Sequence, residues 1–430
     1  MKKACISILL TALLCITGGI VAPSCAGASD TDEVDTVAYT ATSDTVAQLL
    51  GQVMGNKMLH ELLQYRQLED SAYDIDAFSE GLALVLDRRH DAAYENGVGL
   101  GLQMRQDILP LEEAGHTIDR KRIIDSIAAR IDADNPLLRD NDMELRTAYV
   151  TASDRLKAMS AGTQTRALTD SVERLYARFI ADLLNTEIHN FTTTENKPYN
   201  EKLLLKGLAA AFGQKQAPEH GYGAYQGLMV SQYIAVVENK GVNVRRQDVL
   251  SAMQQVLAGR TVDSISTARM DRRLNTILER VGKEKYEAED SVMAASDQAV
   301  QNIKTGEALV AKMKKNTPQA RTTDSGLTYV IHEAGKGDNI AQSDTVVLHY
   351  TASHLDGKVI NTFGSAKIVP DDATAGLREG LLMLRPGAKA SFWVPGALAF
   401  RGHGVPQAGV GPMETVVFDV EVLDVLKAAR

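Results

Sequence analysis

Four pairs of small residues, each pair one helical turn apart, constrain how the first two thirds of this chain can fold. They are Gly51 and Gly55, Gly97 and Gly101, Ala177 and Ala181, and Gly223 and Gly227. Residues at positions i and i+4 lie on one side of an α-helix, and small side chains there let a second helix backbone come close. Charged and amide residues follow each pair within a turn or two, which argues against membrane-spanning helices. The pairs therefore predict tight crossings between soluble helices.

The same order of features occurs twice in this region. Each small-residue pair is followed by a polar capping residue and a second short amphipathic stretch, which begins near Asp74, Asp119, Asn200 or residues 242–244. Proline is scarce and apolar residues recur every three or four positions, a pattern typical of helices. We therefore predict two related all-helical units, over residues 46–160 and 161–282, that arose by duplication.

The chain changes character after residue 282. Residues 283–318 form a polar stretch with a narrow apolar stripe that ends at a Thr-Pro pair, which predicts a connecting helix. The stripe consists of Met293, Val300, Ile303, Val310 and Met313. Alternating, β-branched stretches then predict strands at 327–331, 345–350, 388–394 and 415–423, with one short helix near 375–384. Residues 319–430 are therefore expected to form an α+β domain with an antiparallel sheet.

The N-terminus has the pattern of an export signal. A positively charged start and a short apolar run predict a signal peptide over residues 1–24, and the small, polar segment 25–45 predicts a flexible tether. Cys5 and Cys15 lie inside the signal, so Cys25 is the one cysteine that processing can leave in the mature chain. We predict that Cys25 is lipidated and holds the protein at the cell envelope, facing the periplasm or the cell surface. The alternative is ordinary signal cleavage that removes or tolerates Cys25.

Other classes of chemistry have no support in the sequence. The formal net charge of −9 provides no basic field for a nucleic acid. There is no Cys-x-x-Cys pair, no His-Glu-x-x-His motif and no phosphate-binding loop, and the nine histidines are scattered. We therefore expect neither a metal nor any other cofactor, and no nucleic-acid partner.

Six ordered segments of the last 112 residues resemble one known family. They are 323–331, 344–351, 355–358, 376–381, 394–400 and 417–424. In order and spacing they are similar to the FKBP-type peptidyl-prolyl cis-trans isomerases over residues 319–430. The helical region resembles the N-terminal unit of the macrophage-infectivity-potentiator-like branch, here present twice.

The resemblance implies an activity and a site. Such a domain grips a prolyl residue in an apolar cup and lowers the barrier of about 18–20 kcal/mol to rotation of its peptide bond, without a covalent step. By resemblance, Tyr350, Asn361, Thr374 and Phe400 are the catalytic candidates. The substrate-binding candidates are Ile360, Ala373, Leu377, Val410 and Phe418.

Four of these positions depart from the usual family pattern. The family usually has an aromatic residue at Ile360, Asp at Asn361, Trp at Leu377 and Tyr at Phe400. Leucine offers less flat surface than tryptophan, and phenylalanine donates no hydrogen bond. We therefore expect a folding chaperone for exported, proline-containing client proteins with attenuated isomerase activity. The alternatives are a non-catalytic chaperone or peptide-binding protein and, less favoured, an envelope scaffold.

The resemblance also bears on assembly. Single-copy relatives of the helical unit dimerise by exchanging helices, and a chain with two copies can satisfy that interface internally. We therefore expect a pseudo-dimer within one chain, which would be a monomer with a single isomerase domain.

Overall fold

The computed structural model describes residues 40–69, 73–131, 142–160, 162, 165–259 and 264–427. They fall into two compact units, Met1–Val281 and Gly282–Arg430. The predicted signal peptide, Cys25 and most of the predicted tether lie outside the described residues. Helix α2 begins at Ala41, so the last residues that we assigned to the tether are helical instead.

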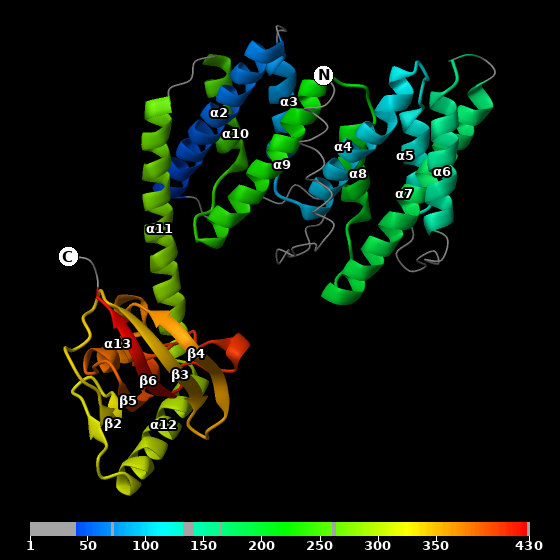
Figure 1. The fold of residues 1–430 in the computed structure, drawn as a ribbon. Helices are drawn as coiled ribbons and strands as arrows, with labels where there is room; N and C mark the ends of the chain where they lie inside the picture. Colours follow the sequence, from blue (N-terminus) through cyan, green and yellow to red (C-terminus); the bar gives the residue numbers. More distant parts are fainter. Residues whose placement is uncertain are drawn as a thin grey trace. The chain divides into compact units, whose positions relative to one another are not determined.

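The described part of the first unit is helical, as predicted (Figure 1). Its helices are α2 (Ala41–Glu69), α3 (Ile75–Leu86), α4 (Ala92–Glu113), α5 (Arg120–Ala128), α6 (Asp142–Lys157), α7 (Arg166–Glu195), α8 (Glu201–Phe212), α9 (Pro218–Asn239), α10 (Arg246–Gly259) and the start of α11 (Ser264–Ala294). Asp74, Asp119 and Asn200 cap α3, α5 and α8 by accepting a backbone N–H bond, as the sequence predicts. No helix within the described ranges is both long enough and apolar enough to cross a membrane.

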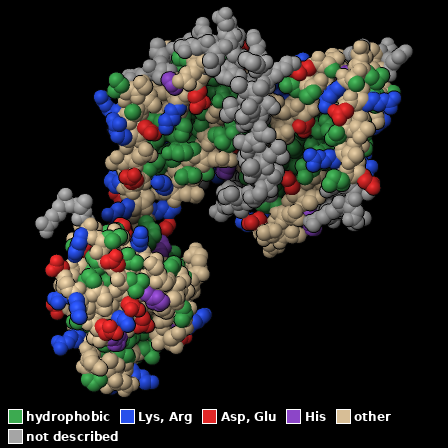
Figure 2. All heavy atoms as spheres, viewed as in Figure 1, with side chains coloured by type: hydrophobic (Ala, Val, Ile, Leu, Met, Phe, Trp, Pro, Cys, Tyr) green, Lys and Arg blue, Asp and Glu red, His purple; other side chains and the backbone are tan. Residues whose placement is uncertain are grey.

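Charged side chains of both signs are scattered over the visible surface. On the face drawn in Figure 2, Lys and Arg side chains lie among Asp and Glu side chains, with apolar and uncharged atoms between them. The described part of this face shows no large patch of a single charge sign.

The two halves of the first unit are interleaved. Helices of the first half pack on helices of the second half in reverse order: α2 on α10, α3 on α9, α4 on α8 and α5 on α7. We predicted two helical units, whereas these cross-pairings make the two halves one compact unit. The physical reason is that each helix buries its small-residue face against the opposite half.

Reciprocal glycine contacts hold the central helices together. A β-carbon at Gly97 on α4 would lie 2.0 Å from the carbonyl oxygen of Leu204 on α8, and one at Gly207 on α8 would lie 2.0 Å from that of Tyr94 on α4. The α3–α9 crossing repeats the arrangement, because Gly223 approaches the Phe78 carbonyl and Gly81 approaches the His220 carbonyl. No side chain larger than hydrogen fits at these positions unless the helices separate.

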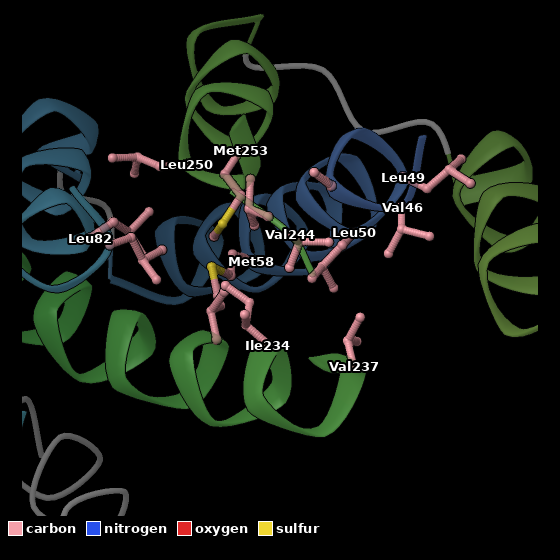
Figure 3. Close-up of a cluster of buried hydrophobic side chains, with 14 of the residues drawn as sticks. Val46, Leu49, Leu50, Met58, Leu82, Ile234, Val237, Val244, Leu250 and Met253 are labelled. Carbon is pink, nitrogen blue, oxygen red and sulfur yellow. The ribbon is translucent and has the colours of Figure 1, made fainter. Parts of the chain in front are cut away.

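The apolar core between the halves is shared by both of them. Figure 3 shows Leu50 and Met58 of α2 pointing toward Ile234 of α9 and Met253 of α10, with Leu82 of α3 beside them. All five side chains are buried or nearly so. Neither half of the chain closes this core by itself.

The second unit is an α+β domain, as predicted. Its antiparallel sheet has the strand order β1-β2-β5-β6-β3-β4. The strands are β1 (Arg321–Thr322), β2 (Thr328–Ala334), β3 (Thr345–His354), β4 (Val359–Ile368), β5 (Ala388–Val394) and β6 (Val416–Leu426). Helix α13 (Ala375–Leu382) packs on the inner face, where a β-carbon at Gly380 would lie 2.7 Å from the Phe392 ring.

The connecting segment differs from the predicted single helix. It consists of the end of α11 and of α12 (Asp297–Asn316), separated at Ala295 and Ser296. The Ser296 hydroxyl accepts a bond from the Ala299 N–H and begins α12. Of the predicted apolar stripe, Met293 and Val300 lie largely in solvent, while Ile303, Val310 and Met313 are half-buried.

We expect Gly97→Ala to destabilise the protein, because the added methyl group meets the Leu204 carbonyl and overpacking typically costs about 1–3 kcal/mol. Gly99→Ala on the same helix is the matched control, since its nearest neighbour would be a side-chain carbon of Leu228 at 3.8 Å. Thermal unfolding should show a lower midpoint for Gly97→Ala and an unchanged or higher one for Gly99→Ala. Equal midpoints for the two variants would contradict the close crossing.

Candidate active site

Aromatic side chains line the inner face of the sheet. Tyr350 on β3 is paired with Phe363 on β4, and the two rings stack with centroids 5.0 Å apart. Ala352, two residues further on the same face, is paired with Phe418 on β6. The Phe418 ring lies 6.4 Å from that of Tyr350. These strands therefore supply a continuous aromatic wall.

The structure brings most of the predicted site residues to this wall. Leu377, Val410 and Phe418 are buried in the apolar cluster of the second unit. The half-buried residues that pack against this cluster include Tyr350, Ile360, Ala373 and Phe400. Partial burial raises the pKa of the Tyr350 hydroxyl, so it stays protonated at neutral pH. These seven predicted site residues therefore belong to, or pack against, one apolar cluster, and we refer to the surface that they are predicted to form as the cup.

Asn361 is a predicted catalytic residue whose side chain is hydrogen-bonded within its own strand. It is exposed on the edge strand β4, although it is paired with Ala352 on the inner face. Its side-chain oxygen accepts a 2.8 Å hydrogen bond from the backbone N–H of Thr362. This oxygen is therefore engaged with the strand of the protein itself.

The hydroxyl of Thr374 is a polar group whose hydrogen bonding is unusual among the predicted site residues. Thr374 occupies the N-cap position of α13, but its side chain makes no capping bond. Its Oγ1 is buried and has no hydrogen-bond partner among the described residues. Because an unpaired buried hydroxyl costs about 1–3 kcal/mol, a ligand that pairs with it gains that energy back.

A folded-back loop carries Phe400 and Val410. It begins with the 3-10 helix η5 (Gly396–Leu398), which immediately precedes Ala399 and Phe400. Val405 and Val410 form an isolated antiparallel bridge, and the Met413 N–H donates a 2.7 Å bond to the Arg401 carbonyl. The positions of Phe400 and Val410 are therefore coupled by backbone bonds within one loop.

The floor of the cup comes from α13. Leu377 is 6% exposed, and its neighbour Gly376 lies so close to β5 that a β-carbon would be 2.3 Å from the Val394 side chain. The helix is therefore pressed onto the sheet, and Leu377 is buried in the apolar cluster beside it.

Phe363 is a site residue that the sequence reading missed. It is 42% exposed and stacked on Tyr350, so its free ring face extends the wall toward solvent. The available signal was an aromatic residue three positions after Ile360. Without β4 in the predicted sheet, no face could be assigned to it.

Two family models match the chain between residues 219 and 423. One is the FKBP-type peptidyl-prolyl cis-trans isomerase, over residues 337–423. The other is the domain amino terminal to FKBP-type peptidyl-prolyl isomerase, over residues 219–331. The α+β fold, the cluster of predicted site residues and the two family matches together define a prolyl isomerase with an attached helical domain.

Comparison with known proteins specifies the family. The chain is 33% identical over 186 residues to a probable FKBP-type peptidyl-prolyl cis-trans isomerase of Haemophilus influenzae, covering 41% of this chain and 71% of that protein. It is 29% identical over 226 residues to the isomerase FkpA of Escherichia coli, covering 52% of this chain and 80% of FkpA. The outer membrane protein MIP of Legionella longbeachae is 27% identical over 203 residues, covering 45% of this chain and 80% of MIP. This chain belongs to the FKBP-type peptidyl-prolyl cis-trans isomerases, which confirms the resemblance seen in the sequence.

A solved structure is also similar. The crystal structure of FkpA from Escherichia coli matches at 27% identity with a TM-score of 0.29, covering 48% of this chain and 94% of that one.

We expect Phe363→Ala to lower kcat/KM for prolyl peptides that have an apolar residue before the proline. An aromatic contact contributes about 0.5–1.5 kcal/mol, which corresponds to a factor of about two to ten. Leu423→Ala on β6 is the control, because Leu423 is similarly exposed but follows the inward-facing Val422. An equal, small effect of both substitutions would remove Phe363 from the cup.

Proposed function

We propose that this chain is a peptidyl-prolyl isomerase and folding chaperone for proline-containing exported proteins, with attenuated catalysis. The observation that carries the proposal is the cup itself, with apolar walls, a leucine floor and no tyrosine hydroxyl at Phe400. It retains the shape for a prolyl ring but has fewer polar groups to hold the neighbouring carbonyls.

The mechanism follows from these walls. Tyr350, Val410 and Phe418 surround the prolyl ring and exclude water, and this dry surface suits the twisted amide, which is less polar than the planar one. The Thr374 hydroxyl, which is buried and has no partner among the described residues, is the proposed donor to a carbonyl of the bound chain once the site opens to admit it. No residue forms a covalent bond, because rotation about the peptide bond requires none.

The positions of the cup that depart from the usual family residues account for the proposed slow turnover. A missing neutral hydrogen bond costs about 0.5–1.5 kcal/mol, and 1.4 kcal/mol corresponds to about tenfold in rate. Phe400 lacks one such bond, and Asn361 lacks a charge and directs its oxygen to Thr362. The effects share one small cup, so they need not add.

The second candidate function is a chaperone without catalysis. Phe363 and Ile360 are partly exposed. Exposed apolar side chains of this kind also suit transient binding of unfolded chains. The two functions separate in one assay: a non-catalytic chaperone suppresses aggregation of a client but leaves its proline-limited refolding rate unchanged.

The assembly proposal is a monomeric pseudo-dimer. The glycine crossings between α4 and α8 and between α3 and α9 bury the small-residue faces of both halves within one chain. At these described crossings a second chain would have no small-residue face to pair with, so we expect one particle to carry one isomerase domain.

Localisation is proposed at the cell envelope through a lipid on Cys25. The support is the signal-like start of the sequence and the position of Cys25 directly after it. The proposed clients are accordingly exported proteins.

We expect Leu377→Trp, Phe400→Tyr and Asn361→Asp, combined, to raise kcat/KM by up to about tenfold in a proline-limited refolding assay. The changes restore a flat floor, a donor and a charge, and circular dichroism should show an unchanged fold. A correctly folded triple variant without gain, or a wild-type chain as fast as a robust family member, would show that these positions do not limit the rate.

We expect Cys25→Ser to move the protein from the membrane fraction to the soluble fraction, because the substitution removes the thiol that carries the lipid. Fractionation of cells that express either form tests this. An unchanged distribution, with a mature N-terminus beyond Cys25, would rule out the anchor.

A further inference from the structure

A buried carboxylate outside the cup holds the loop that carries Phe400. Asp290 lies in the part of α11 that belongs to the second unit and is 2% exposed. Its Oδ1 accepts hydrogen bonds from the backbone N–H groups of Gly402, at 2.8 Å, and His403, at 3.2 Å. Its Oδ2 lies 3.0 Å from Nη2 of Arg401. A carboxylate is buried at this depth only when such partners compensate for its lost hydration.

The loop is also fitted to the helix by shape. A β-carbon at Gly402 would lie 2.1 Å from the backbone carbonyl oxygen of Asp290, so only glycine allows this approach. The His403 ring stacks on Tyr286 of the same helix, with centroids 4.1 Å apart and an angle of 23° between the planes. Helix and loop therefore touch over three consecutive loop residues.

The held segment is connected directly to the cup. Arg401 follows Phe400 and has a φ angle of 54°, a left-handed conformation that is costly for a residue with a side chain. The Gly404 N–H donates to the Phe400 carbonyl at 3.1 Å, and the Met413 N–H donates to the Arg401 carbonyl at 2.7 Å. The Arg401 N–H also donates to the Gly396 carbonyl at 2.8 Å, and the bonds from Asp290 add to these contacts within the loop. The orientation of Phe400 depends on this left-handed turn.

We propose that Asp290 is a positioning residue of the isomerase. It acts through the backbone of residues 401–404, which it keeps in the conformation that places Phe400 and Val410 at the cup. Asp290 does not touch the substrate. The two backbone hydrogen bonds matter more than the ion pair, because Arg401 is half exposed and exposed ion pairs contribute little.

The test compares three variants in the full-length protein. Asp290→Ala removes both acceptors, Asp290→Asn keeps one oxygen for the two N–H groups, and Glu289→Ala removes an exposed carboxylate from the same helix as the control. The readouts are kcat and KM for a prolyl peptide, and amide hydrogen exchange of the peptide that covers residues 400–410.

We expect Asp290→Ala to lower kcat/KM by about tenfold, the scale on which a misplaced site residue acts, mainly through kcat. Exchange should accelerate in residues 400–410 and stay unchanged in β3, β5 and β6. Asp290→Asn should lie between Asp290→Ala and the wild type, because it keeps one acceptor for the backbone but loses the charge beside Arg401, and Glu289→Ala should stay within about twofold of the wild type. The proposal is overturned if Asp290→Ala keeps wild-type kinetics and loop protection, if Asp290→Asn is as impaired as Asp290→Ala, or if exchange accelerates throughout the sheet.

Discussion

The closest approach between helix backbones determines how the helical unit is built. Gly97 and Gly207 each face a carbonyl of the other helix at a distance that excludes a β-carbon, and Gly81 and Gly223 repeat this at the next crossing. At both crossings the glycine and the carbonyl that it faces belong to different halves of the chain. The halves therefore interleave, and the core that contains Leu50, Leu82 and Met253 closes only when both are present.

The isomerase domain follows a helical unit in which the two halves of the chain are interleaved. Two interleaved halves provide one helical unit, and a single α+β domain follows it. The proposed apolar cup of that domain has few hydrogen-bond donors. One of them is the Thr374 hydroxyl, which is buried and has no partner among the described residues. The loop that carries Phe400 is held from outside the cup by Asp290. These features are the basis on which we propose attenuated catalysis.

The sequence predicted the parts of the fold that follow from local pattern. Helix starts at Asp74, Asp119 and Asn200 depend on one capping residue each, and the buried strands alternate visibly. Strand β4 was missed because it is an edge strand with mostly exposed residues, so it has no alternation to detect. Phe363 was missed with it. The break at Ser296 has a local signal, the Ser296 N-cap of α12, which the sequence prediction did not use. The contact of Asp290 with Gly402 joins residues 112 positions apart, which no local pattern records.

The most direct test of this account is the mass of the purified protein in solution, measured by light scattering over a dilution series. An interleaved pair of halves within one chain predicts a mass near that of the single chain, 46.6 kDa before any processing, at every concentration. A mass near twice this value that persists on dilution would contradict the account, because the halves would then exchange helices between chains.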